Sequence, residues 1–389
     1  MTGSPIKVAY LDYSNIFAGA ERALCTIVNH LDRQQITPIV IFPYPMAHHD
    51  MYHLDDTEIF YLSPEKKWWM GSEYWEHAPR GADILKRFIF GIKLARLLKR
   101  EKVDILHVNL LRRDSFMWMY PSKKQGVKIV AHFRSDSLEW IAPRYTQRCC
   151  NLIICVSQFN KDRLLSRGTW TNTKVVYDSI ASSRLRTTHK KNECKAQLGI
   201  AEDCFLISSV GQLQPHKGHD KAIQAFAQVY HSHKDVILYI AGGGTSSELH
   251  RLKSLVAKYP EIKSHVLFSG KQVDMVPVYK ASDLVLSLSQ RGEAFGLVPY
   301  EAAYMKTPFI APNRGAVKEF ITHKTNGLLV SPCDVDEITQ TIEWVISSPK
   351  RIDQLINAAY KTVSDNLDPV IMTEKLSQIY QGIFDEPTE

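Results

Sequence analysis

Short apolar runs and longer amphipathic segments alternate along this chain of 389 residues. The runs are rich in Val and Ile and are typical of strands in a parallel sheet that is buried on both faces. In the first half they are IKVAYLDY, PIVIF, EIFYL, VDILHVNL, VKIVAHF, LIICVS and KVVYDSI. In the second half they are CFLISSVGQL, VILYIAGG, HVLFSG, LVLSLS, PFIAP and GLLVS. The alternation predicts an α/β fold.

The alternation lapses over residues 181–200, which are polar and basic, and we interpret this segment as a linker between two similar domains. Each half then forms a doubly wound, Rossmann-like unit, and two facing units create a cleft at the carboxyl ends of their strands. The predicted domains are residues 1–185 and 186–367. Helical patterns cover 334–347, 350–363 and 370–384, and the segment 368–389 is predicted to hold a C-terminal helix that packs back on the first domain, followed by a tail.

Composition narrows the class of protein only slightly. A hydrophobic content of 44% suits two packed cores, and no apolar run approaches the ~20 residues that cross a bilayer. The N-terminus also lacks the apolar core of a signal peptide, so we predict a cytoplasmic location. The net charge of +7 comes from the first half, where residues 1–190 carry 28 basic and 18 acidic side chains. This uneven distribution of charge is compatible with binding to nucleic acid, to an anionic membrane or to a phosphorylated substrate. It does not discriminate among these three.

The segment SQRGEAFGLVPYEAAYMKTPFIAPNRGAVKEF carries the clearest chemistry. Glu293 and Glu301 bracket Phe295-Gly296-Leu297 at a predicted helix start, directly after a buried strand. Gly296 allows close backbone approach, and the amides of the helix N-terminus suit a diphosphate. Glu293 can accept hydrogen bonds from sugar hydroxyls, and Glu301 can hold a ribose diol. The alternative is an ordinary pair of glutamates on a surface helix.

Three other patterns resemble functional motifs, and we assign each a structural role. Asp334-Val335-Asp336 matches the D-x-D metal pattern, but Asp334 is better placed as a helix N-cap and Asp336 as a first-turn acidic residue. Gly242-Gly243-Gly244 lacks the full dinucleotide-binding spacing and is interpreted as a strand-to-helix turn. His216 and His219 lack a third ligand at suitable spacing. The sequence therefore predicts neither a metal site nor a cofactor.

The glutamate segment resembles the E-x7-E signature of family-4 glycosyltransferases, which are retaining enzymes of the GT-B fold. Glu319 and the closing NGLLVSPCD extend the resemblance. VGQLQPHKGHD at 210–220 is similar to the motif in which a glycine turn and a lysine meet the donor phosphates, with Lys217 as the match. GAERAL at 19–24 is similar to the N-terminal loop of the family, and Gly19 opens a helix there. The resemblance is specific over about 205–332 and looser over 1–180.

The resemblance implies transfer of a sugar from a UDP- or GDP-sugar to a glycan, lipid-linked or other acceptor, with retention, in cell-surface polysaccharide or glycoconjugate biosynthesis. It implies no metal, no cofactor and no nucleic-acid partner. His132, at the end of VKIVAHF, takes the position of a histidine that contacts the donor sugar in relatives. The catalytic residues expected are His132, Glu293 and Lys217. Residues expected at the donor are Gly19, Gly211, Gln212, Lys217, Phe295, Gly296, Leu297 and Glu301. Arg134 and Arg314 are candidates for acceptor or phosphate, with a solvated loop as the alternative for Arg134 and Asp136.

Five residues at four sites depart from the pattern of the relatives. Gln212 stands where many have an arginine, which removes a positive charge from the phosphate motif. Lys306 and Arg314 replace glycines, and Asp178-Ser179 replaces a common asparagine-glycine pair. Arg314 is a candidate to restore the missing charge. The departures keep two other readings open: a non-catalytic relative that binds nucleotide sugars, and a GT-B phosphorylase or epimerase.

An amphipathic segment at 81–102, GADILKRFIFGIKLARLLKREK, separates apolar side chains such as Phe88 and Ile89 from many basic ones. Basic amphipathic helices bind anionic lipid surfaces. Trp68, Trp69 and Trp75 precede it and suit either a membrane interface or an acceptor sugar. We therefore hypothesise peripheral attachment to the inner face of a membrane. The alternative is an ordinary helix packed on the sheet.

Overall fold

The computed structural model describes residues 4–14, 17–45, 47–64, 81–112, 115–135, 148–166, 168 and 172–385, without the side chains of 47, 81–84 and 86. Trp68, Trp69, Trp75 and Asp136, which the sequence analysis singled out, lie outside the described residues.

The chain divides into two compact units: unit 1 is Met1–Ser179 with Pro369–Glu389, and unit 2 is Ile180–Asp368. The division precedes the predicted boundary at 185/186. The physical reason is that residues 180–185 pack on unit 2, where the Ile180 N–H donates to the Leu367 carbonyl at 3.2 Å. The C-terminal helix belongs to unit 1.

Unit 1 is built on a parallel sheet. Its described strands are β1 (Ile6–Leu11), β2 (Ile36–Phe42), β3 (Glu58–Tyr61), β4 (Ile105–Val108), β5 (Lys128–Phe133), β6 (Leu152–Cys155) and β7 (Thr173–Val175). They pair in the order β3-β2-β1-β4-β5-β6-β7. Every predicted run of the first half overlaps one of these strands, although KVVYDSI shares only residues 174–175 with β7. Apolar side chains on both faces of a strand suit a sheet that helices cover on both sides.

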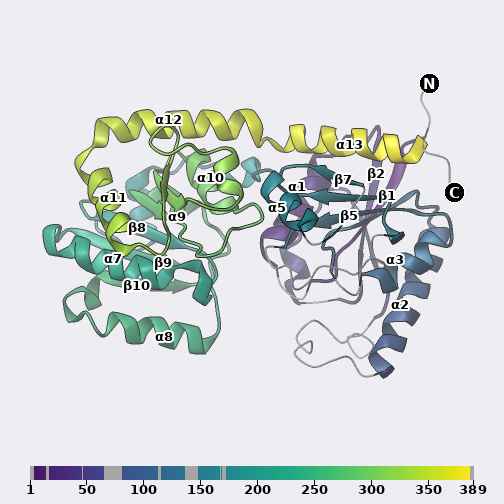
Figure 1. Ribbon diagram of the computed structural model, residues 1–389, viewed down its shortest axis with the longest axis horizontal. Coiled ribbons are helices and arrows are strands. Elements are labelled where there is room, and N and C mark those ends of the chain that lie inside the picture. The colour runs from purple at the N-terminus through teal and green to yellow at the C-terminus, as the bar shows by residue number, and fades with distance from the viewer. Residues whose placement is uncertain are drawn as a thin grey trace. The chain divides into compact units, whose positions relative to one another are not determined.

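The helices of unit 1 come from the first half of the chain and from its end. Those described are α1 (Gly19–His30), α2 (Gly81–Arg100), α3 (Phe116–Lys123), α5 (Gln158–Leu165) and α13 (Pro369–Asp385), with a 3-10 turn at Ala47–Met51. Helix α13, drawn in yellow, packs on α1 and β1 (Figure 1). Leu376 and Ile383 of α13 share one buried apolar cluster with Leu24 and Val28 of α1, so the end of the chain completes the core of unit 1.

Unit 2 repeats the plan. Its described strands are β8 (Phe205–Val210), β9 (Val236–Ala241), β10 (Val266–Gly270), β11 (Leu284–Leu286), β12 (Phe309–Pro312) and β13 (Leu328–Val330). Its described helices are α6 (Lys191–Gln197), α7 (His219–Ser232), α8 (Ser246–Val256), α9 (Val276–Ala281), α10 (Leu297–Tyr304), α11 (Val335–Ser347) and α12 (Pro349–Asn366), with 3-10 turns at Ser182–Leu185, Pro215–Lys217, Pro260–His265 and Ala316–Glu319. The strands pair in the order β10-β9-β8-β11-β12-β13, all parallel.

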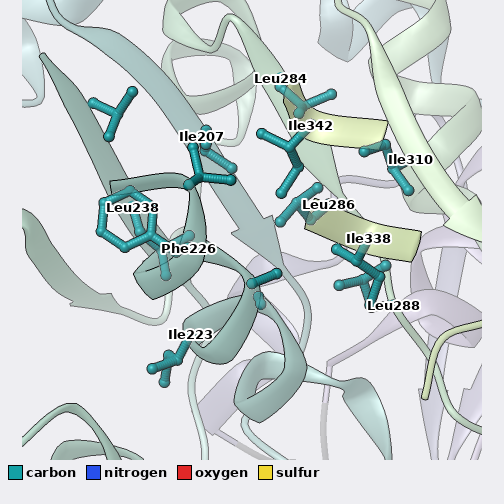
Figure 2. Close-up of a cluster of buried hydrophobic side chains, with 14 of the residues drawn as sticks. Ile207, Ile223, Phe226, Leu238, Leu284, Leu286, Leu288, Ile310, Ile338 and Ile342 are labelled. Carbon is teal, nitrogen blue, oxygen red and sulfur yellow. The ribbon is translucent and has the colours of Figure 1, made fainter. Parts of the chain in front are cut away.

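The core of unit 2 lies between this sheet and helices that include α7 and α11. Figure 2 shows Phe226 of α7 and Ile342 of α11 among strand residues that include Ile207 and Leu286. Each of these four side chains is at most 1% exposed. This packing fixes the carboxyl ends of β8 and β11, from which the loops described below emerge.

Both sheets reverse their strand order at one point, between β1 and β4 in unit 1 and between β8 and β11 in unit 2. In doubly wound sheets, ligands bind beyond the carboxyl ends of the strands at such a switch point, because the loops there diverge and leave a crevice. The fold class is thus confirmed as two Rossmann-like α/β domains. Among the described helices, none combines the length and the apolar content that a membrane crossing requires.

Candidate active site

Lys217 and Glu293 meet at the switch point of unit 2. Lys217 ends the 3-10 turn that follows β8, and Glu293 lies in the loop that follows β11. The Lys217 ammonium donates to Glu293 Oε1 at 2.7 Å. Both side chains keep about a quarter of their surface exposed, 25% and 23%, so the ion pair can still reach a ligand. The two residues predicted to be catalytic in this half are therefore neighbours.

The lysine turn is held against the loop after β11 by a glycine. Gly218 has φ +76°, and a Cβ at this position would lie 2.1 Å from the Leu288 carbonyl oxygen. The Gln290 N–H also donates to the His216 carbonyl at 2.7 Å. Only glycine combines this conformation with so close an approach. The turn therefore delivers Lys217 to Glu293.

His219 has a structural role in the same turn. It is 1% exposed, and its Nδ1 lies 2.8 Å from Ser209 Oγ while its Nε2 lies 3.2 Å from the Gln212 carbonyl oxygen. Both ring nitrogens are thus engaged within the protein. No group of three or more potential metal ligands occurs among the residues that the structure describes.

Two more glycines let the backbone close around Glu293. Gly296, the N-cap of α10, has φ +80°, and a Cβ there would lie 2.8 Å from Glu293 Oε2. Gly315 has φ +81°, and a Cβ there would lie 2.8 Å from the Glu293 backbone nitrogen. The Ala316 N–H donates to the Glu293 carbonyl at 3.3 Å. The segment after β12 and the start of α10 therefore fix the position of this carboxylate.

Glu301 lies in the second turn of α10, where its side chain is directed inward. It is 9% exposed, and its Oε2 accepts a hydrogen bond of 2.5 Å from the hydroxyl of Tyr279, a fully buried residue of α9. Its Oε1 makes no hydrogen bond to any described residue. The alternative of an ordinary surface pair of glutamates is excluded, because Glu301 is buried and Glu293 is held by Lys217.

The other donor-side residues have varied surroundings. Phe295 is buried and packs on Tyr300 with ring centroids 5.0 Å apart, so only its backbone is available to a ligand. Leu297 is half-buried at the first position of α10, and Gln212 is exposed beside Gly211. Arg314 is exposed and donates to the Gln290 carbonyl at 2.9 Å, which brings it to the segment between β11 and Glu293.

Lys306 stands at a position whose backbone conformation favours glycine. It has φ +56° directly after the end of α10, a left-handed position that favours glycine. Its ammonium lies over the Tyr360 ring at 4.8 Å, on α12. Position 306 is therefore part of the C-terminal end of α10.

Two of the structural interpretations are confirmed. Asp334 is the N-cap of α11, and its Oδ1 accepts from the Glu337 N–H at 3.0 Å, with Asp336 in the first turn. Gly242-Gly243-Gly244 joins β9 to the start of α8, and a Cβ on Gly242 would lie 1.7 Å from the Gly211 carbonyl oxygen. These glycines allow close packing of two loops.

The switch point of unit 1 holds a buried polar cluster that the sequence analysis missed. Asp12 follows β1, and its Oδ2 accepts from Asn109 Nδ2 at 2.9 Å and from the Tyr52 hydroxyl at 3.3 Å. Glu21 of α1 accepts from the Ala18 N–H at 2.8 Å. Both carboxylates are at most 2% exposed. Burial, and next the charge of Asp12, raise the pKa of Glu21 to about 7.

We expect Glu21→Gln to stabilise the protein at alkaline pH. A folded-state pKa of about 7 against 4.5 means that Glu21 favours folding below pH 4.5 and that this contribution is lost as the pH rises through 7. The loss is on the order of 3 kcal/mol at most, and glutamine avoids it. Urea unfolding at pH 4 and pH 8 should show a gain only at pH 8. The exposed Glu58→Gln serves as control, and an equal gain in both variants contradicts the assignment.

Gly19 opens α1 beside this cluster, and no described residue of unit 1 requires a glycine there. A Cβ at this position would meet no described atom within 4 Å. Gly218 and Gly242, by contrast, are needed for packing. A functional reason for Gly19, such as close approach of a ligand to the helix N-terminus, is therefore consistent with the structure.

His132 lies at the carboxyl end of β5, and Arg134 follows it. His132 is 1% exposed, and its pKa is lowered well below the ordinary value by burial, then by the charge of Arg134 and by His107. The Arg134 guanidinium is buried, pairs with Asp178 and also approaches His132 Nδ1 at 3.2 Å. The alternative of a solvated loop is wrong for Arg134. The Asp178 departure supplies the counter-charge for this buried arginine.

Asp12, Asn109, His107 and Tyr279 are candidate site residues that sequence reasoning missed. A signal was present for three of them, because each is a polar residue in or directly after an apolar run: His107 and Asn109 in VDILHVNL, and Asp12 in IKVAYLDY. Tyr279 carries no such signal, since its contact with Glu301 joins two separate helices.

Comparison with known proteins agrees with this architecture. The model for Glycosyltransferase Family 4 matches residues 17–184, and the model for Glycosyl transferases group 1 matches residues 190–362. N-acetyl-alpha-D-glucosaminyl L-malate synthase of Bacillus anthracis is 25% identical over 304 residues, which cover 75% of this chain and 77% of that protein.

Solved structures share the fold over nearly the whole length. Anabaena Alr3699/HepE in complex with UDP has a TM-score of 0.79 at 22% identity, covering 97% of this chain and 100% of its own. A glycosyltransferase from Rickettsia africae has a TM-score of 0.82 at 21% identity, covering 98% and 100%. The two glycosyltransferase models match 17–184 and 190–362, so that each covers most of one unit. The chain therefore belongs to the group 1 glycosyltransferases of family 4.

Proposed function

We propose that this glycosyltransferase is a retaining, metal-independent enzyme that transfers a hexosyl group from a UDP- or GDP-sugar to a glycan, lipid-linked or other hydroxyl acceptor. We also propose that it acts in cell-surface polysaccharide or glycoconjugate biosynthesis. The observation that carries the proposal is the Lys217–Glu293 ion pair at the switch point of unit 2, 2.7 Å long and partly exposed. A cation and a carboxylate in contact suit a reaction that separates charge.

Each group has a distinct task in this proposal. Lys217 and the amides at the start of α10 stabilise the negative charge of the departing diphosphate, without a metal. Glu293 accepts hydrogen bonds from the sugar and favours the positive charge that develops at the anomeric carbon. Glu301, held by Tyr279, uses its second oxygen for the ribose hydroxyls. Arg314 is a candidate for the charge that Gln212 does not supply.

In the transfer itself, the bond between the anomeric carbon and the diphosphate oxygen breaks and the acceptor oxygen bonds to the same face of that carbon. The proton of the acceptor hydroxyl moves to an oxygen of the leaving phosphate. The products are the glycosylated acceptor and the nucleoside diphosphate, so no further base is needed.

The comparisons support a nucleotide-sugar donor. The Anabaena structure contains UDP, and a further structure of the same protein contains UDP-glucose. The Bacillus anthracis relative is named for an N-acetyl-alpha-D-glucosaminyl product. These names concern those proteins, and they make UDP-glucose and UDP-N-acetylglucosamine the first donors to test here.

A thermal-shift panel of UDP- and GDP-sugars, followed by a transfer assay with and without excess chelator, tests the proposal. A donor present at 100 times its dissociation constant adds about 2.7 kcal/mol of stability, so the correct donor should stand out. Turnover should persist in chelator. Activity that is lost in chelator and restored by Mn²⁺ or Mg²⁺ contradicts metal independence. Binding without hydrolysis or transfer favours the non-catalytic relative.

We also propose that α2 attaches the enzyme to an anionic membrane surface. Its inward face buries Phe90, Leu94 and Leu98, whereas Leu85, Phe88 and Ile89 are 62%, 42% and 40% exposed. The same helix exposes basic side chains at Lys93, Arg96, Lys99 and Arg100. Exposed apolar residues next to basic ones complement a lipid surface of negative charge.

Flotation with vesicles that contain anionic lipid, at low salt, tests this attachment. The wild-type chain should float, and Leu85→Ser/Phe88→Ser should stay in solution while keeping its thermal melt. Val273→Ser, which changes another exposed apolar residue, should float like the wild type. Absence of binding by the wild type removes the proposal.

A further inference from the structure

A continuous chain of buried hydrogen bonds in unit 1 joins the C-terminal helix to His132. The hydroxyl oxygens of Tyr10 and Tyr380 are 3.0 Å apart, and that of Tyr380 lies 2.6 Å from His107 Nδ1. His107 Nε2 in turn lies 2.7 Å from His132 Nδ1. All four side chains are at most 1% exposed, and they come from β1, α13, β4 and β5.

Arg134 fixes the direction of every proton in this chain. A guanidinium only donates hydrogen bonds, and Arg134 Nη2 lies 3.2 Å from His132 Nδ1, so that nitrogen must be an acceptor. The proton in the 2.7 Å contact therefore belongs to His107 Nε2. A neutral His107 then has a bare Nδ1, which accepts from the Tyr380 hydroxyl.

The two imidazoles are neutral in this arrangement. Burial, and next the charge of Arg134, lower the pKa of His107 to about 3, and the same two causes act first on His132. With Nδ1 bare and the ring neutral, the one proton of His132 lies on Nε2. That nitrogen makes no hydrogen bond to any residue that the structure describes.

We propose that Tyr380 of α13, acting through His107, is a positioning residue that holds His132 as the Nε2–H tautomer, so that His132 donates a hydrogen bond to a hydroxyl oxygen of a sugar substrate. The inference rests on the proposed glycosyltransferase site. It gives α13 a function beyond packing, because the last helix of the chain then controls a side chain that meets substrate. His132 in this state cannot serve as a base through Nε2.

The tautomer is measured directly by long-range ¹H–¹⁵N correlation spectra of ¹⁵N-histidine protein at pH 7, with His132→Gln and His107→Gln to assign the signals. Wild type should show one set of signals for each ring, with the proton on Nε2 and a bare Nδ1. A proton on His132 Nδ1, or a doubly protonated ring, overturns the proposal. This measurement requires no turnover, so it stands apart from a failure to find a donor.

Two matched variants test positioning. Tyr380→Phe and Tyr10→Phe each remove one hydroxyl from a fully buried ring, but only Tyr380 donates to His107. Tyr380→Phe should add a second tautomer to the spectrum and lower kcat/KM by roughly fivefold to tenfold, the size of one lost hydrogen bond. Tyr10→Phe should keep one tautomer and change kcat/KM by less than about twofold. Equal effects of the two variants on spectrum and rate mean that the hydroxyls serve folding alone and overturn the proposal.

Discussion

Replacing Glu293 by glutamine is expected to lower kcat by about two to three orders of magnitude while leaving donor affinity nearly unchanged. The proposed task of Glu293 is to stabilise positive charge at the anomeric carbon, and that charge develops only in the transition state. Glutamine keeps the shape that Gly296 and Gly315 enclose, so the loop should stay in place. Steady-state kinetics with calorimetry of donor binding measure the two effects separately.

Glu301→Gln is the matched comparison, since it makes the same chemical change eight positions along the chain. Glu301 is proposed to hold the ribose in both the ground state and the transition state, so its loss should cost about 1.5 to 3 kcal/mol, mostly in donor binding. A well-folded Glu293→Gln enzyme with near-normal kcat would refute the role given to Glu293. Identical kinetic profiles for both variants would refute the division of tasks between them.

Replacing Lys217 by alanine is expected to reduce both kcat and donor affinity, with a loss in kcat of about a hundredfold to a thousandfold. The ammonium is the cation proposed for the diphosphate, which is charged when bound and gains charge as it leaves. Alanine also leaves the Glu293 carboxylate without its 2.7 Å partner. Kinetics and calorimetry on the same preparation test both parts.

Because of the ion pair, the effects on kcat of replacing Lys217 and of replacing Glu293 should depend on each other. Because Lys217 and Glu293 are in contact, the double variant Lys217→Ala/Glu293→Gln should lose less activity than the product of the single losses. Lys253→Ala, at an exposed lysine of α8, should be neutral. Full multiplicativity would indicate that the two groups act independently, and unchanged kcat in a folded Lys217→Ala enzyme would rule out its proposed role.

The sequence by itself was enough to predict the strands and the last three helices. Each apolar run overlaps a strand, because a strand buried on both faces must be apolar along its length. The helices predicted at 334–347, 350–363 and 370–384 appear as α11, α12 and α13. The cap at Asp334 was also predictable, since its partner Glu337 is only three residues away. Interactions of this kind depend on residues that are close together in the sequence, so the sequence alone can predict them.

Contacts between distant parts of the chain were decided by tertiary structure alone. Lys217 and Glu293 carried motif signals, but their 2.7 Å contact depends on β8 pairing with β11, which brings two distant loops to one switch point. The Arg134–Asp178 pair and the bond from Tyr279 to Glu301 likewise join separate elements. The same holds for Tyr380 and His107, which meet because α13 returns to unit 1. Strand order and helix packing set these distances, and periodicity within a segment carries no information about them.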